Sequence, residues 1–213
     1  MVEIIAIDGP AGSGKSSVSK EVARRLNFGY LDTGAAYRAL AWAVAEGKTP
    51  KPDSHFDGFE YEISLDPDDF WVRTYGVDVT DEIRLPRIAE SVSAVAQVSS
   101  VREFMKKLTR RLVETSKRSG VVVEGRDITT VVAPDAKVRI LLTASESVRI
   151  DRRAKELSLE QVNNLKAQVL DRDATDSKVV DFMNAAPGVT LVDSTDLNFE
   201  QTVDAVLSII REQ

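Results

Sequence analysis

The run from residue 4 to residue 17 constrains the fold of this 213-residue chain more than any other feature. Ile4-Ile5-Ala6-Ile7 is an apolar run typical of a buried parallel strand. The segment that follows, Gly9-Pro10-Ala11-Gly12-Ser13-Gly14-Lys15-Ser16, fits the pattern G-x-x-x-x-G-K-S/T. Its glycines let the backbone turn tightly, so that N–H groups converge on a phosphate, and the next helix points its positive end at the same anion. The run therefore predicts a strand, a phosphate-binding loop and a helix, in that order.

Two side chains of this loop carry specific chemistry. Lys15 is expected to reach the β- and γ-phosphates of a nucleoside triphosphate, and the hydroxyl of Ser16 is expected to ligate Mg²⁺. A loop of this kind occurs in kinases, in GTPases and in motor ATPases, so the rest of the chain must decide among them.

The rest of the chain alternates short apolar runs with helical patterns. This alternation predicts an α/β fold with a parallel sheet covered by helices on both faces. Besides the first strand, the apolar runs predict four more strands at 30–32, 121–124, 138–142 and 189–192. Helices are expected after the loop, from Thr33, over 86–118 and after Asn198.

Two segments interrupt this pattern and divide the single domain. Between about 47 and 85, a Pro-, Gly- and Asp-rich stretch leads into alternating apolar and polar residues, which predicts a small antiparallel β insertion. Between about 146 and 184, a polar segment rich in Arg and Asp predicts a helical lid. The core is then expected at 1–46, 86–145 and 185–213.

Composition excludes several classes of protein. The absence of cysteine rules out disulfides and thiolate metal sites. A net charge of −6 argues against general nucleic-acid binding. No apolar stretch approaches the ~20 residues that cross a bilayer, and the first residues do not resemble a signal peptide. We therefore expect a cytoplasmic protein, monomeric, without a membrane or nucleic-acid partner.

Polar residues follow the second and third predicted strands. Leu31 to Arg38 contains a carboxylate, a hydroxyl, an aromatic ring and a guanidinium, and Glu124-Gly125-Arg126-Asp127 follows three valines. Both segments end strands at the edge where ligands bind in open α/β sheets. Glu124 is placed like the carboxylate that holds Mg²⁺, directly or through water, and Arg126 could clamp a phosphate. The alternatives are a core-facing Tyr37 with a solvated Arg38, and an ordinary Arg126–Asp127 ion pair.

The polar segment 146–184 holds a further group of charged side chains. Arginines that close over a transferring phosphoryl group stabilise its charge, and a helical lid can deliver them. We expect Arg149 and Arg153 to contribute to ATP binding, although each arginine of the segment taken singly is more often a solvated helix residue. The other members of the group are Arg152, Arg172, Asp173 and Asp176.

These motifs together resemble those of bacterial cytidylate kinases. The resemblance rests on the phosphate-binding loop and on residues 31–38, 92–96 with 101–102, 124–128, 131–136, 142–145 and 172–177. It implies a five-stranded parallel core with an insertion that binds a nucleoside monophosphate and with an arginine-bearing lid. It also implies transfer of the γ-phosphoryl group of ATP to CMP or dCMP, with Mg²⁺ as cofactor, in pyrimidine nucleotide metabolism.

The resemblance assigns roles to individual residues. ATP would be held by Gly9, Pro10, Ala11, Gly12, Ser13, Gly14, Lys15, Ser16 and Ser17. Ser93, Arg102 and Asp127 would read cytosine, while Thr33, Tyr37 and Arg38 would line the acceptor pocket. Arg126 would hold the CMP phosphate, and Arg172 and Asp176 would approach the phosphate and ribose. Lys15, Arg126 and Arg172 would be the catalytic cations.

Two positions depart from the family pattern. Thr129 stands where the family usually has glycine, which makes the backbone there less free. Lys178-Val179-Val180 follows the Asp-Ser of the lid where the family has an arginine and then Pro-Leu, and a lysine cannot reproduce a bidentate clamp. An inactive relative therefore stays open as an alternative.

Two other functions also stay open at this point. A kinase acting on an alcohol would need a general base near its acceptor, with Asp32 and Asp127 the candidates. A GTP-dependent switch would need an Asn-Lys-x-Asp motif, which the sequence lacks.

Overall fold

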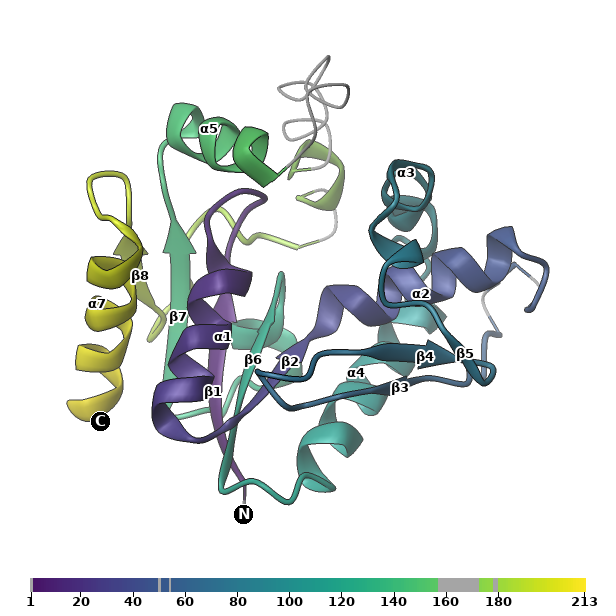
Figure 1. Cartoon of the computed structure of the whole chain (residues 1–213), viewed down its shortest axis with the longest axis horizontal. Helices are drawn as coiled ribbons and strands as arrows, with labels where there is room; N and C mark the ends of the chain where they lie inside the picture. The colour runs from purple at the N-terminus through teal and green to yellow at the C-terminus, as the bar shows by residue number, and fades with distance from the viewer. Residues whose placement is uncertain (1, 50, 54, 157–172, 178–179) are drawn as a thin grey trace.

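The computed structural model describes residues 2–49, 51–53, 55–156, 173–177 and 180–213, and its main element is a five-stranded parallel sheet (Figure 1). The strand order is β2-β6-β1-β7-β8, and every neighbouring pair is parallel. This confirms the predicted α/β fold. The strands are β1 (Glu3–Asp8), β2 (Gly29–Asp32), β6 (Gly120–Gly125), β7 (Val138–Thr143) and β8 (Thr190–Asp193).

Helices cover both faces of this sheet. Helices α1 and α7 pack together on one face, while α2 and α4 lie on the other side with α3 beyond them (Figure 1). Helix α5 lies beyond the carboxyl end of β7. The helices are α1 (Lys15–Leu26), α2 (Thr33–Ala45), α3 (Pro86–Ala96), α4 (Ser99–Glu114), α5 (Glu146–Glu156) and α7 (Phe199–Arg211), with a 3-10 helix at Glu82–Arg84 and a π-helix at Ile128–Val132.

The apolar runs of the strands are explained by burial on both faces. On β1, Ile5 and Ile7 are fully buried in the cluster beneath α1 and α7. Ala6, between them, is fully buried in the cluster on the opposite face, beneath α2 and α4. Because successive side chains of a strand point to opposite faces, a strand buried on both must be apolar throughout.

The predicted insertion forms a separate antiparallel sheet of three strands. These are β3 (Glu62–Ile63), β4 (Val72–Thr74) and β5 (Val77–Asp78). The loop between β3 and β4 is joined to the core, because Tyr30 N donates to Leu65 O at 2.9 Å. Arg118 also pairs with Asp66 at 3.0 Å.

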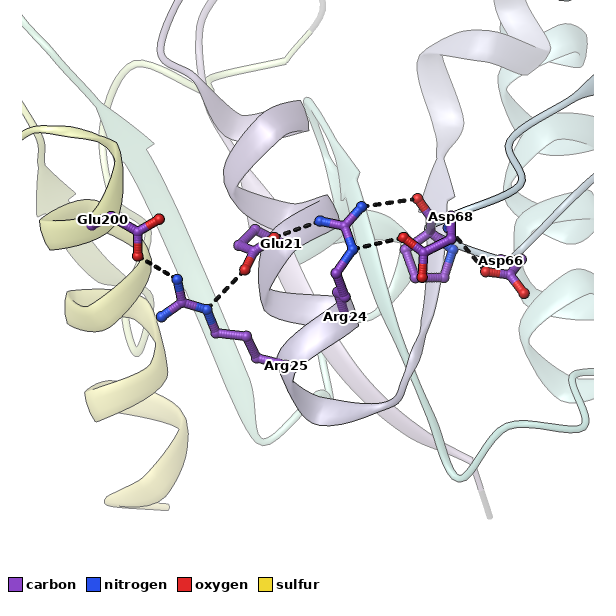
Figure 2. Close-up of polar contacts among 7 residues, drawn as sticks. Glu21, Arg24, Arg25, Asp66, Asp68 and Glu200 are labelled. Carbon is purple, nitrogen blue, oxygen red and sulfur yellow. Dashed lines mark hydrogen bonds and ion pairs between the residues drawn. The ribbon is translucent and has the colours of Figure 1, made fainter.

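Ion pairs on α1 join the insertion and α7 to the core. Figure 2 shows Arg24 pairing with Glu21 and, at 2.7 Å, with Asp68 of the β3–β4 loop. Arg25 pairs with the same Glu21 and with Glu200 on α7. Helix α1, which begins at the phosphate-binding loop, is thus held on both sides by charged contacts.

The predicted lid is described only in part. Helix α5 and residues 173–177 are described, whereas Arg172 and Lys178 lie outside the described residues. In the parts of the chain that the structure describes, no helix combines the length and apolar character needed to cross a membrane.

Candidate active site

The phosphate-binding loop has the backbone that its glycines predict. Gly12 and Gly14 have φ angles of 73° and 85°, in the left-handed region that favours glycine. A Cβ on Gly12 would also lie 2.3 Å from Arg149 O. Lys15 begins α1, and its Nζ donates to Pro10 O at 3.3 Å. Backbone N–H groups at the start of a helix and a lysine thus face one space at the carboxyl edge of the sheet.

A buried carboxylate, Glu124, lies beside this loop at the end of β6. It is 2% exposed, and it accepts hydrogen bonds from Tyr30 Oη at 3.0 Å and from the Ser16 hydroxyl. Burial and the neighbouring Asp32 raise the pKa of Glu124, while Lys15 acts in the opposite direction. A hydroxyl and a carboxylate together are the oxygen donors that Mg²⁺ prefers.

Asp32 and Arg38 form a buried ion pair at the start of α2. Asp32 caps the helix by accepting from Ala35 N at 3.1 Å, and its other oxygen pairs with Arg38. Although burial acts to raise it, the adjacent cations, Arg38 first, hold the pKa of Asp32 below its ordinary value. Arg38 is therefore not the solvated helix residue considered above.

A small pocket lies between α2, α4 and the end of β6. Arg102 Nη2 and Asp127 Oδ2 lie 2.7 Å apart at this pocket, and Thr33 Oγ1 donates to Glu124 O. Burial raises the pKa of Asp127, and Arg102 opposes that shift. Burial also raises the pKa of Tyr37. The lining residues are Thr33, Tyr37, Arg102, Met105, Lys106, Thr109, Asp127, Ile128 and Val132.

The turn that carries Arg126 and Asp127 is fixed to the sheet by Asp8. This carboxylate, at the end of β1, accepts from Ile128 N at 2.9 Å, Thr129 N at 2.8 Å and Thr129 Oγ1 at 2.6 Å. A π-helix follows at Ile128–Val132, a form often found at functional sites. Thr129, which departs from the family pattern, therefore supplies a third donor to a buried carboxylate.

We expect Thr129→Val to destabilise the protein by about 1–3 kcal/mol, because a buried carboxylate loses a hydroxyl donor. Burial raises the pKa of Asp8, and the lost bond would raise it further. The deficit should therefore be full at pH values above the pKa of Asp8 in the variant and should shrink as the pH falls from there toward the pKa in the wild type, since the protonated acid needs the donor less. Urea unfolding between pH 8 and pH 5 measures this. A deficit that grew on acidification would contradict the assignment.

Arg126 is surrounded by carboxylates and by one aromatic ring. Its Nη1 donates to Gly9 O at 3.0 Å and pairs with Asp173 Oδ1 at 3.1 Å, and its Nη2 lies 3.4 Å from Asp176 Oδ2. The guanidinium carbon lies 4.2 Å from the centre of the fully buried Phe182 ring. Arg126 is thus directed at the mouth of the phosphate-binding loop and is not paired with its neighbour Asp127.

Arg149 reaches the same point from α5. Its Nη1 donates to Ala11 O at 2.8 Å and pairs with Asp173, which itself accepts from Ala11 N at 3.0 Å. Two guanidinium groups, one following β6 and one on α5, are therefore held together by the buried carboxylate of Asp173.

A larger cavity, of about 290 Å³, lies on the other side of the phosphate-binding loop. Phe199 is 46% exposed and offers an aromatic side chain there. The cavity is lined by Ser13, Gly14, Ser17, Val18, Arg152, Lys155, Leu197, Asn198, Phe199 and Thr202.

The structure thus brings together most of the predicted site residues. Lys15, Ser16 and Glu124 form one group, Thr33, Tyr37, Arg102 and Asp127 a second, and Arg126, Arg149 and Asp176 a third. Ser93 lies on α3 and is not among the residues that line the small pocket. Arg153 lies on α5 next to Arg152.

Several site residues escaped the sequence motifs. Met105, Lys106 and Thr109 occupy the pocket-facing side of α4, and no sequence motif marked them as site residues. Leu197 and Phe199 line the larger cavity because α7 starts at the carboxyl edge of the sheet. The capping box at Asn198 and Gln201 marked that helix start, and its position after the fifth strand was the available signal.

The chain is similar to known proteins of one family. The family model described as cytidylate kinase matches residues 5–212. A cytidylate kinase of Cutibacterium acnes is 45% identical over 217 residues, covering 97% of this chain and 95% of that protein. A cytidylate kinase of Streptomyces avermitilis is 42% identical over 216 residues, covering 99% and 93%. An uncharacterized protein from Eubacterium ventriosum shares the fold, with a TM-score of 0.55 at 13% identity over the whole of both chains.

Proposed function

Because the chain belongs to the cytidylate kinase family and is therefore an ATP-dependent nucleoside monophosphate kinase, we propose how its residues carry a phosphoryl group from ATP to CMP and dCMP. The backbone of Gly9 to Ser17 binds the triphosphate, with Lys15 at the β- and γ-phosphates. The nucleoside of ATP enters the cavity of about 290 Å³ beside the loop, where Phe199 offers a ring for stacking.

We assign the acceptor base to the Arg102–Asp127 ion pair at the small pocket. Cytosine presents an amino donor at N4 beside acceptors at N3 and O2. Asp127 accepts from the amino group and Arg102 donates to the acceptors, and their ion pair at 2.7 Å places both groups on one edge. Uracil reverses the first two groups and would leave buried polar atoms unpaired. None of the described residues that line this pocket reads only a 2′-hydroxyl, which is why dCMP is included.

Arg126 lies between the two sites and is the observation that carries this proposal. It contacts the carbonyl of Gly9 in the donor loop and lies next in sequence to Asp127 in the acceptor pocket. Asp173 and Asp176 orient its guanidinium. We assign the CMP phosphate to this guanidinium, with Arg149 held close by through Asp173. Arg172 and Arg38 complete the proposed acceptor set, the former outside the described residues.

The reaction requires no strong base. A phosphate oxygen of CMP is already anionic near neutral pH, since the second pKa of such monoesters is about 6. That oxygen forms a bond to the γ-phosphorus while the bond to the β–γ bridging oxygen breaks, which releases ADP and forms CDP. Lys15, Arg126 and Arg149 hold the reactants in line and stabilise the charge on the transferring group.

Ser16 and Glu124 would hold Mg²⁺, directly or through water. The fit is chemical, because a hydroxyl and a buried carboxylate already lie in contact beside the phosphate-binding loop. The ion would neutralise charge on the β- and γ-phosphates.

The carboxylate pairs argue against an alcohol as acceptor. Deprotonating an alcohol needs a carboxylate that is available as a base. Asp32 is paired with Arg38 and caps α2, and Asp127 is paired with Arg102.

We propose that the enzyme works as a monomer in the cytoplasm.

ADP formation with a panel of acceptors tests this function. With ATP and Mg²⁺, we expect CMP and dCMP to give ADP together with CDP or dCDP, and UMP, AMP and shikimate to give much less. If CMP and dCMP gave no more ADP than a control without acceptor, the proposal would fail.

A further inference from the structure

Arg152, on α5, makes four hydrogen bonds to two segments that line the larger cavity beside the phosphate-binding loop. Its Nη1 donates to Ser13 O at 3.1 Å and to Ser194 Oγ at 2.9 Å. Its Nη2 donates to Ser194 O at 2.8 Å and to Leu197 O at 3.3 Å. One guanidinium therefore joins the phosphate-binding loop to the segment 194–197 that precedes α7.

Ser194 extends this connection to the central sheet. It is fully buried, and both its N–H and its hydroxyl donate to Thr143 O, the former at 2.9 Å and the latter at 2.9 Å. The hydrogen bonds thus run from the end of β7 through Ser194 to Arg152, and from there to the phosphate-binding loop. The distance between the phosphate-binding loop and the start of α7 sets the width of the cavity. Arg152 holds this distance, because it bonds to both sides.

We propose that Arg152 is a positioning residue for the donor nucleotide. It holds Leu197 and the first turn of α7 at the distance from the phosphate-binding loop that a nucleobase requires. A planar guanidinium can serve both segments at once, whereas a single ammonium group cannot span them. This inference rests on the proposal that the cavity takes the nucleoside of ATP.

Binding to the full-length chain tests the inference, with ADP and inorganic tripolyphosphate as two calorimetric probes. ADP needs both the cavity and the loop, whereas tripolyphosphate needs only the loop. For Arg152→Met we expect ADP to bind at least about tenfold more weakly, on the scale of lost bonds to a charged group. Tripolyphosphate affinity and the KM for CMP should stay within about twofold of wild type.

Arg25→Met is the matched control. It also removes an arginine that holds α7, through Glu200 (Figure 2) and Asp204, but Arg25 and these two partners are not among the residues that line the cavity. ADP affinity should be unchanged in this variant. An equal loss in Arg25→Met, or an equal loss of ADP and tripolyphosphate affinity in Arg152→Met, would overturn the inference. So would ADP binding within twofold of wild type.

Arg152→Lys decides the question if the methionine variant does not fold. The lysine keeps the charge, so we expect a wild-type melting temperature and ADP binding weakened by at least about threefold. Full ADP affinity in a folded Arg152→Lys would overturn the inference. If the wild type bound ADP but did not phosphorylate CMP, only the proposed acceptor would be wrong. If it bound no ADP, both the proposed donor site and this inference would be wrong.

Discussion

Arg126→Met should lower kcat/KM for CMP by about 10³-fold, the lower end of the range for an arginine that stabilises a transferring phosphoryl group. The reason is the position of this guanidinium. Arg126 follows the end of β6, contacts Gly9 O of the phosphate-binding loop and lies against the ring of Phe182. Without it, one cation fewer stabilises the negative charge on the phosphoryl group as it passes from ATP to CMP. Steady-state kinetics with ATP saturating and CMP varied measures the change.

Arg126→Lys separates geometry from charge. Because an ammonium group cannot form two parallel bonds to a phosphate, the lysine variant should recover only part of the loss. ADP affinity should remain near wild type in both variants. Arg118→Met, which removes a half-buried arginine paired with Asp66, is the control and should leave kcat/KM within about twofold of the wild-type value. A loss of less than tenfold in Arg126→Met would show that this residue does not hold the acceptor phosphate.

Asp127→Asn should reduce the preference for CMP over UMP in kcat/KM by at least about tenfold. The amide offers an acceptor and a donor, so it can pair with uracil as well as with cytosine, whereas the carboxylate only accepts. The ion pair with Arg102 is lost at the same time, which frees a donor for the uracil carbonyl. Parallel measurements of kcat/KM with the two nucleotides give the ratio.

Asp204→Asn is the matched control for this change. Asp204 is an exposed carboxylate on α7 that pairs with Arg25 of α1 and does not line the acceptor pocket. Its replacement should leave the CMP to UMP ratio unchanged. An unchanged ratio in Asp127→Asn would mean that this carboxylate does not read the base.

The five strands and the phosphate-binding loop could be predicted because their patterns are local. The apolar runs at 4–7, 121–123 and 138–142 reflect burial on both faces, and each lies within an observed strand. The predicted family was likewise confirmed, since its motifs cover nearly the whole chain in order. The α/β fold followed from the same alternation.

The partners of individual charges could not be predicted in this way. Arg126 and Asp127 are adjacent in sequence, yet Arg126 contacts Gly9 and Asp173, while Asp127 pairs with Arg102. Consecutive residues after a strand can point to different sides of the turn, and the turn itself depends on Asp8, 121 residues before Thr129. Similarly, the sequence does not distinguish the three arginines on α5, because all three belong to the same polar helical segment. Only the structure shows that Arg152 bonds to residues 13, 194 and 197.

The strand, loop and helix at residues 3–26 were determined by the sequence itself, because glycine torsions, apolar burial and helix polarity act over a few residues. Only the tertiary structure decided which side of that loop faces each proposed substrate. It placed the small pocket with Arg102 and Asp127 on one side of the loop and the larger cavity, which Arg152 lines, on the other. Both depend on contacts between residues far apart in the chain, and such contacts leave no local periodicity from which they could be predicted.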